Sequence, residues 1–69
     1  MVKLYTTDDC GWCKLAKSRL NFANIPYEEV TDMKVIEEKG FKTVPQLELP
    51  DGQILDHNEL ITWVNQQAQ

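Results

Sequence analysis

The only two cysteines of this 69-residue chain, Cys10 and Cys13, are separated by two residues. A domain of this length buries a thin core, so it needs either a cross-link or a very economical fold. A disulfide between these two cysteines would close too short a loop to remove much entropy from the unfolded chain. We therefore predict one compact domain over residues 1–69, in which the cysteine pair serves a chemical purpose rather than a stabilising one.

Short runs of β-branched and aromatic residues predict four strands. These runs are Val2–Thr6, Tyr27–Val30, Gln46–Leu49 and Ile54–Leu55. Pro50–Gln53 has the composition of a tight turn, which would join the last two strands into a hairpin.

Three helices are predicted between and after these strands. The first would begin at a cap on Asp9 and end before Pro26. Its apolar residues recur with a period of 3.6, at Trp12, Leu15, Ala16, Leu20 and Ala23. The second is short, with a cap at Thr31–Asp32 and a stop at Gly40. The third follows a capping box over Asp56–Glu59 and turns inward Leu60, Ile61 and Val64.

The element order βαβαββα predicts an α/β domain with a mixed sheet. Strand–helix–strand units connect in parallel, whereas the closing hairpin is antiparallel.

Cys10 and Cys13 lie where the first predicted strand gives way to the first predicted helix. The free N–H groups and the positive dipole end of a first helical turn favour a thiolate at Cys10. The thiolate is the form that attacks disulfides. Cys13, one turn deeper, is expected to be the more buried thiol that resolves the mixed disulfide. Trp12 offers an apolar contact to a docking substrate.

A second element of interest is Thr43-Val44-Pro45. Proline at the start of a strand lacks an N–H and costs the sheet a bond. X–Pro bonds adopt the cis form at modest cost, and a cis bond here would turn the Val44 backbone outward, where it can pair with an extended peptide.

The cysteine spacing also fits half of a zinc site. Zinc needs four ligands, and only His57 and scattered carboxylates are available to complete the set. Redox chemistry is therefore the favoured interpretation, and no metal is predicted. The acidic pairs Glu28–Glu29 and Glu37–Glu38 fit solvated faces better than sites.

Charge and hydropathy argue against two classes of partner. The net charge is −4, without the basic excess that nucleic-acid binding requires. No apolar stretch approaches the roughly 20 residues of a membrane span. The start, Met1–Tyr5, shows no signal-peptide pattern. We expect a protein of the reducing cytoplasm, where a free CxxC suits redox chemistry.

Four segments together resemble the glutaredoxins of the thioredoxin superfamily, namely Leu4–Thr6, Cys10–Cys13, Thr43–Gln46 and Asp56–Val64. The resemblance spans nearly the whole chain. It implies a thioredoxin-like fold, with a central mixed sheet of four strands flanked by three helices. It also implies that Cys10 is the nucleophile, Cys13 the resolving thiol and Pro45 a cis proline facing both.

The resemblance further implies a substrate groove around the cysteines. Lys42 matches a basic position that meets a glutathione carboxylate, and Val44 matches the residue whose backbone pairs with glutathione's cysteine. The chain departs from the family in having Thr7 in place of a common Lys or Arg, and Leu55-Asp56 in place of Gly-Gly. The expected substrate contacts are Tyr5, Thr7, Trp12, Lys42, Thr43, Val44, Pro45, His57 and Asn58.

The implied activity is that of an enzyme that reduces protein disulfides or glutathione mixed disulfides by a dithiol mechanism. No cofactor is required, and glutathione is the expected co-substrate of a monomer. Some short glutaredoxin-like proteins are instead reduced by thioredoxin reductase and serve ribonucleotide reductase. Two alternatives stay open: a dimeric carrier of a [2Fe–2S] cluster, held by the first cysteine and glutathione, and a binding module with inert cysteines.

Overall fold

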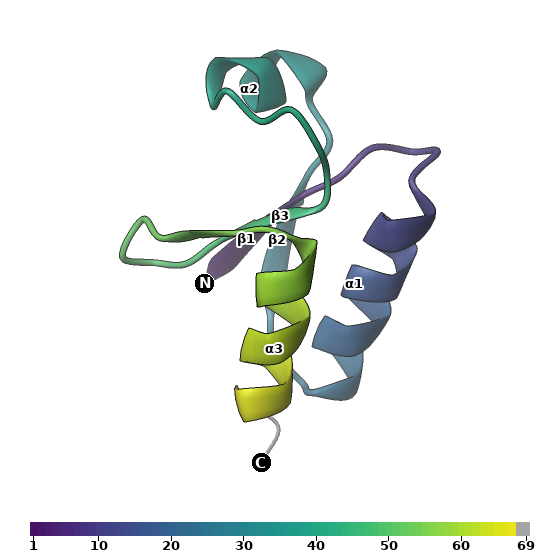
Figure 1. The fold of residues 1–69 in the computed structure, drawn as a ribbon, viewed down its shortest axis with the longest axis vertical. Helices are drawn as coiled ribbons and strands as arrows, with labels where there is room; N and C mark the ends of the chain where they lie inside the picture. Colours follow the sequence, from purple (N-terminus) through teal and green to yellow (C-terminus); the bar gives the residue numbers. More distant parts are fainter. Residues whose placement is uncertain (68–69) are drawn as a thin grey trace.

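Four strands and three helices alternate in the order βαβαββα in the computed structural model, which describes residues 1–67. The strands are β1 (Val2–Tyr5), β2 (Tyr27–Val30), β3 (Gln46–Glu48) and β4 (Ile54–Leu55). The helices are α1 (Gly11–Phe22), α2 (Met33–Glu38) and α3 (His57–Gln67). The predicted α/β class and element order are confirmed (Figure 1). Residues 68 and 69 of the predicted domain lie outside the described residues.

The sheet has the strand order β2-β1-β3-β4. β1 and β2 are parallel, with Leu4 opposite Glu29, and β3 runs antiparallel to both β1 and β4. The sheet is mixed, as expected, but the prediction that both strand–helix–strand units are parallel is wrong for the second unit. The six residues of α2 span only about 9 Å, which is too short to return the chain to the opposite end of the sheet. β3 therefore begins near the end where β2 stops and runs in the opposite direction.

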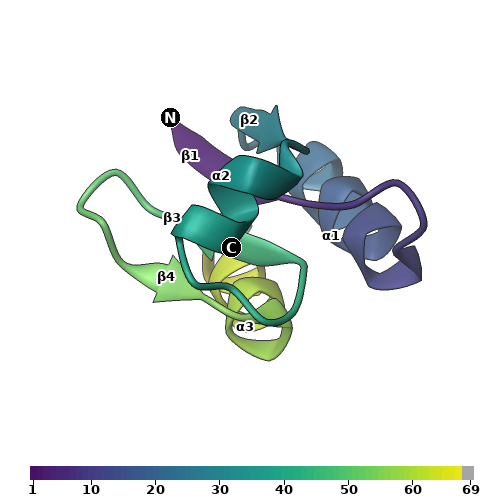
Figure 2. The ribbon, with the colours of Figure 1, turned by 90° about the horizontal axis from the view of Figure 1, so that it is seen from above.

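The helices cover both faces of the sheet. Figure 1 shows α1 and α3 side by side on one face, and Figure 2, seen from above, shows α2 on the opposite face. The β3–β4 turn projects away from α1 in both views. No helix within residues 1–67 combines the length and the apolar character that crossing a membrane requires.

The hydrophobic core lies between the sheet and the α1–α3 pair. Its buried residues are Val2, Leu4, Ala16, Leu20, Leu47, Leu55, Leu60 and Val64. The inward face predicted for the last helix is confirmed, with Ile61 packing against the core from a half-buried position. The face predicted for the first helix is partly wrong, because Trp12 and Leu15 are exposed. Cys13, Ala16 and Leu20 form the buried face instead.

Local signals set the ends of α2 and α3. Asp32 caps α2 by accepting a hydrogen bond from the Lys34 N–H at 2.9 Å. Asp56 and Glu59 form the predicted capping box, in which each side chain accepts from the other's backbone N–H, at 2.9 and 3.1 Å. Gly40, which follows α2, adopts a φ of 78°, a left-handed conformation that glycine reaches without strain.

Candidate active site

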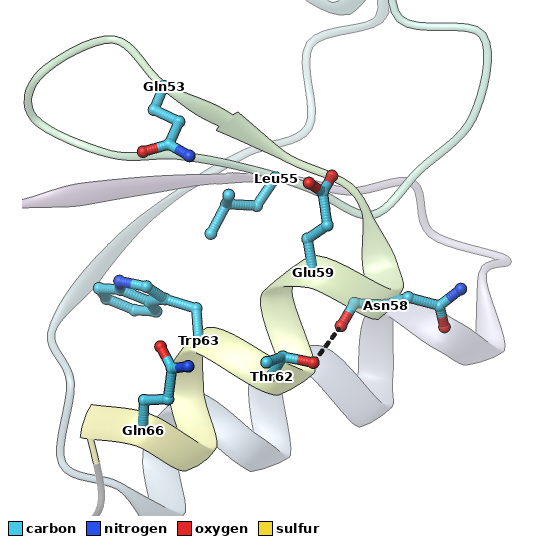
Figure 3. A pocket seen from close by; sticks show the side chains of 7 residues that line it. All are labelled: Gln53, Leu55, Asn58, Glu59, Thr62, Trp63 and Gln66. Carbon is cyan, nitrogen blue, oxygen red and sulfur yellow. Dashed lines mark hydrogen bonds between the residues drawn. The ribbon is translucent and has the colours of Figure 1, made fainter.

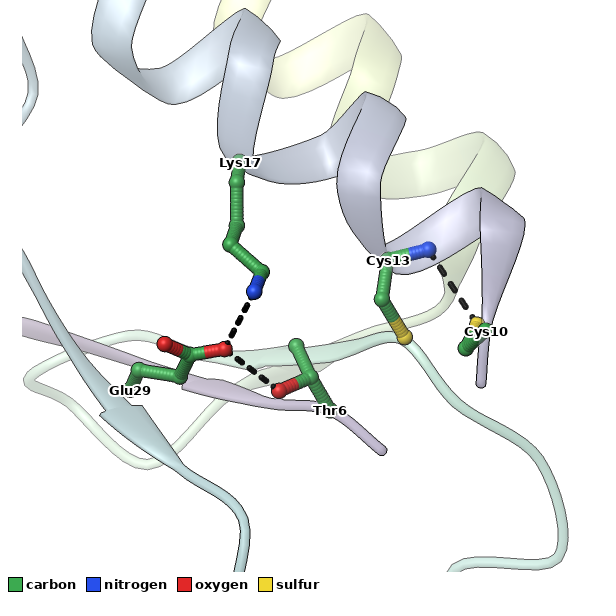
Figure 4. Close-up of polar contacts among 5 residues, drawn as sticks. All are labelled: Thr6, Cys10, Cys13, Lys17 and Glu29. Carbon is green, nitrogen blue, oxygen red and sulfur yellow. Dashed lines mark hydrogen bonds and ion pairs between the residues drawn. The ribbon is translucent and has the colours of Figure 1, made fainter. Parts of the chain in front are cut away.

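Cys10 is the residue that caps α1. Its Sγ accepts a hydrogen bond from the backbone N–H of Cys13, with an N–S distance of 3.1 Å (Figure 4). The predicted cap at Asp9 is therefore wrong: the sulfur takes the free N–H, and the Asp9 carboxylate accepts from the Thr7 hydroxyl at 3.4 Å instead. The sulfur of a half-buried cysteine thus sits at the positive end of a helix of 12 residues.

Cys13 lies one turn further along α1 and is only 1% exposed. Burial, followed by the hydrogen bond to Cys10, raises the pKa of the Cys13 thiol to about 11. The Thr7 backbone N–H and the Lys17 charge act in the opposite direction. Cys13 is consequently protonated at neutral pH, and its sulfur is less accessible to solvent than that of Cys10.

The segment that leads into β3 lies beside Cys10. The Val44–Pro45 peptide bond is cis, and the Pro45 side chain is fully buried. The Cys10 thiol donates to the Val44 carbonyl oxygen, with a distance of 3.7 Å between sulfur and oxygen. The backbone of Val44 therefore borders the sulfur of Cys10. The expected cis form of Pro45 is confirmed, whereas pairing of the Val44 backbone with a substrate stays a prediction.

A cavity of about 140 Å³ lies beside this contact. It brings together the predicted substrate residues Thr7, Lys42, Thr43 and Val44. The sequence did not predict the other three lining residues, Met33, Ile36 and Phe41. Their place depends on how α2 packs over the sheet, which no local pattern encodes.

Trp12 and His57 meet close to the cysteine pair. The Trp12 side chain is 62% exposed, and its ring lies against that of His57 with centroids 4.7 Å apart and planes tilted by 53°. Within residues 1–67, His57 Nδ1 is buried without a hydrogen-bond partner. Trp12, which lies between the two cysteines in the sequence, is thus an accessible apolar surface that packs against His57 at the start of α3.

Tyr5 does not line the groove, and the prediction that it contacts substrate is wrong. Its side chain is 1% exposed, and its hydroxyl donates to Glu48 Oε1 at 2.6 Å. Its ring packs edge-on against Phe41, with centroids 5.0 Å apart. Burial and the Glu48 carboxylate raise the pKa of Tyr5 to about 12. Tyr5 therefore packs at the end of β1 against Phe41, which lines the 140 Å³ cavity.

Asn58 lies apart from the cavity beside Cys10. It borders a larger cavity of about 360 Å³ between α3 and β4, together with Gln53, Leu55, Glu59, Thr62, Trp63 and Gln66 (Figure 3). No cysteine lines this cavity. Neither Cys10 nor Cys13 lines the smaller cavity either, but that cavity includes Val44, whose carbonyl oxygen accepts from the Cys10 thiol.

A polar network that the sequence did not predict lies behind Cys13. The buried hydroxyl of Thr6 donates to Glu29 Oε2 at 2.8 Å, and the Lys17 ammonium meets the same oxygen at 2.6 Å (Figure 4). Glu29 is therefore a partner of two residues near the site and not merely part of a solvated face.

No group of three or more His, Cys, Asp or Glu side chains within residues 1–67 is arranged to hold a metal ion.

The family model for glutaredoxins matches residues 2–55, well over half of the chain. The chain belongs to the glutaredoxin family. Among curated proteins, none matches it significantly.

Solved structures agree with this assignment. A structural-genomics target protein from X. campestris is 28% identical, with a TM-score of 0.68, and the match covers 96% of this chain and 97% of that one. A thioredoxin-like protein that is 23% identical shares the fold, with a TM-score of 0.75 over 97% of this chain and 99% of that one.

Glutaredoxin 2 from Salmonella typhimurium, solved in complex with glutathione, is 30% identical with a TM-score of 0.67. That match covers 94% of this glutaredoxin but only 33% of the Salmonella protein. The thioredoxin-like fold is confirmed, and the family supports a thiol–disulfide redox function for the CxxC pair.

Proposed function

We propose that this protein is an enzyme that reduces protein disulfides or glutathione mixed disulfides by a dithiol mechanism. The observation that carries the proposal is the position of the Cys10 sulfur, which caps α1 and accepts the Cys13 N–H at 3.1 Å. One sulfur is reachable and the other is buried one helical turn away. Dithiol exchange needs this pairing of an attacking thiolate with a resolving thiol.

In the proposed cycle, the Cys10 thiolate attacks one sulfur of the substrate disulfide. The other substrate sulfur leaves as a thiolate and takes up a proton from solvent. Cys13 then loses its proton and attacks Cys10 Sγ, which releases the second substrate sulfur and leaves a Cys10–Cys13 disulfide. The substrate has gained two electrons, and an external thiol reductant returns two electrons to the cysteine pair.

Glutathione is the proposed co-substrate. The Lys42 ammonium lines the cavity next to Val44 and offers a cation to a glutathione carboxylate. Thr7, in the same cavity, provides a hydroxyl where many glutaredoxins have a second cation. The glutathione complex of the Salmonella glutaredoxin supports the same choice.

Thioredoxin reductase is the proposed alternative reductant, and ribonucleotide reductase is a proposed protein substrate. Both are supported by the resemblance of this chain to short glutaredoxin-like proteins. We also propose a monomer that works in the reducing cytoplasm, where a dithiol stays available for exchange.

Turnover of a small mixed disulfide tests the proposal. The assay compares glutathione plus glutathione reductase with thioredoxin reductase, for the wild-type protein and the Cys10→Ser variant. We expect turnover with at least one reducing system and only background with Cys10→Ser. Unchanged turnover in that variant would show that the activity does not pass through Cys10.

A further inference from the structure

Lys17 connects the helix that carries both cysteines to strand β2. It follows Cys13 by four residues on α1, so the two side chains share one face of the helix. Its Nζ lies 2.6 Å from Glu29 Oε2 on β2, and the fully buried Thr6 donates to that same oxygen at 2.8 Å. Figure 4 shows the Lys17 side chain extending from α1 toward Glu29, with the Cys13 side chain pointing from the same helix toward the sheet.

The charges of this network act on Cys13 and on one another. The Lys17 ammonium lowers the pKa of Cys13, against the larger effects of burial and of the hydrogen bond to Cys10. In return, Cys13 contributes to a raised pKa of Lys17, although the hydrogen bond to Glu29 is the main cause. The Glu29 carboxylate therefore offsets part of the positive charge that reaches Cys13. The remaining groups that act on this pair are Tyr27, through Lys17, and the Thr7 backbone N–H, through Cys13.

The resolving step makes this charge balance important. Cys13 has to become a thiolate before it attacks Cys10 Sγ, yet burial, the largest cause of its raised pKa, keeps most of it protonated at pH 7. A nearby charge that lowers the pKa of Cys13 enlarges this small thiolate population and speeds resolution, by less than the gain in population because nucleophilicity falls with pKa.

Glu29 itself is poorly suited to take the proton. Hydrogen bonds from Lys17 and Thr6 lower the pKa of its carboxyl group, so the carboxylate is a weak base at neutral pH.

The Cys13 proton passes to solvent, the Cys13–Cys10 bond forms, and the bond from Cys10 to the substrate sulfur breaks. The departing thiolate then takes a proton from solvent.

We infer that Lys17 and Glu29 tune the resolving step with opposite signs: Lys17 promotes ionisation of Cys13, and Glu29 restrains it by neutralising Lys17. Both are positioning residues that act through Cys13 and do not touch the substrate. The inference rests on the dithiol cycle proposed above.

Rapid mixing of the reduced protein with 5,5′-dithiobis(2-nitrobenzoate) separates the two steps. Attack by Cys10 releases a first coloured thiolate at a rate that depends on reagent concentration. Attack by Cys13 then releases a second thiolate at a rate that does not. The variants are Lys17→Met and Glu29→Gln, where the glutamine keeps an oxygen for the Thr6 hydroxyl. Lys17→Arg tests whether restoring the charge restores the rate.

We expect Lys17→Met to slow the second phase roughly 3–10-fold, a range reduced from a full opposite-charge effect because the Lys17 and Glu29 side chains are 34% and 35% exposed. Glu29→Gln should accelerate the second phase roughly 2–5-fold, and Lys17→Arg should stay within about twofold of wild type. In the matched control, Lys14→Met removes an exposed charge from the same helix, and the second phase should keep its wild-type rate.

The pH profile of the second phase adds a readout that packing alone does not move. Its midpoint should rise in Lys17→Met and fall in Glu29→Gln. Changes of the same sign in both variants, or no change in either, would overturn the inference while leaving the dithiol cycle intact. A wild-type protein that releases no first thiolate would instead overturn the proposed function. Thermal unfolding of each variant shows whether it folds. If one variant does not fold, the direction of the change in the second-phase rate of the other variant, together with that of Lys17→Arg, decides the inference.

Discussion

Replacing Tyr5 with phenylalanine removes one buried hydroxyl and keeps the packing of the ring. That hydroxyl donates to Glu48 Oε1 at 2.6 Å, and the carboxylate also meets the Lys39 ammonium at 3.1 Å. A hydrogen bond to a charged group contributes about 1.5–3 kcal/mol. Because Lys39 still partners Glu48 in the variant, we expect a loss near the lower end, about 1.5–2 kcal/mol at pH 7. For a domain of this size, that lowers Tm by roughly 6–16 °C.

Burial of the Tyr5 hydroxyl, followed by its hydrogen bond to Glu48, gives the effect a pH dependence. The pKa of Tyr5 is raised from 10.0 to about 12, so folding favours the neutral phenol. Its contribution is fully present below pH 10 and is lost as pH rises through 12. A shift of two pKa units corresponds to about 2.7 kcal/mol of linkage. The pKa of Cys13 is raised from 9.0 to about 11, so its ionisation also lowers the stability of the fold as the pH rises from 9 through 11. This loss is the same in wild type and variant, so it does not change the gap between them.

Urea unfolding of the reduced proteins at pH 7, 9, 10, 11 and 12 measures this difference directly. The gap in unfolding free energy between wild type and Tyr5→Phe should be constant up to about pH 10 and should close by about pH 12. A gap that does not change with pH would refute the role assigned to the Tyr5 hydroxyl. So would a variant as stable as wild type at pH 7.

Three further predictions concern the site and its support. Asp56→Ala removes half of the capping box that begins α3 and should cost about 1 kcal/mol, seen as a lower Tm with little change in the rate of Cys10 alkylation. Lys42→Met should raise the KM for a glutathione mixed disulfide severalfold but not that for an uncharged mixed disulfide, measured side by side in steady state; equal effects on both would argue against a carboxylate contact. Anaerobic purification should yield a colourless monomer, whereas a coloured, glutathione-dependent dimer would favour the alternative of a [2Fe–2S] cluster carrier.

Features with a local physical cause could be predicted from the sequence. The capping box at Asp56 and Glu59 forms within four residues, and Gly40 stops α2 because its own backbone adopts a positive φ. The strand-to-helix junction at Cys10–Cys13 is likewise encoded by adjacent patterns. Element order and the location of the cysteine pair follow from such signals.

Features that depend on long-range packing were missed. Nothing local to β3 shows that it runs antiparallel to β1, and alternation along β1 does not reveal that the Tyr5 hydroxyl is satisfied by Glu48, 43 residues later. Because carboxylates are the commoner caps, the sequence favours Asp9 as the cap of α1, yet the Cys10 sulfur holds that place. The role of Glu29 likewise requires α1 and β2 to be placed side by side.

Accurate mass measurement of trapped intermediates most directly tests which sulfur attacks. Cys13→Ser and Cys10→Ser are each mixed with a disulfide substrate under identical conditions, and the adduct is assigned to a residue by peptide mapping. The proposed mechanism predicts that Cys13→Ser accumulates a mixed disulfide on Cys10, whereas Cys10→Ser stays almost unmodified because its remaining thiol is buried and protonated. Rapid adduct formation on Cys13 in the Cys10→Ser variant would contradict it.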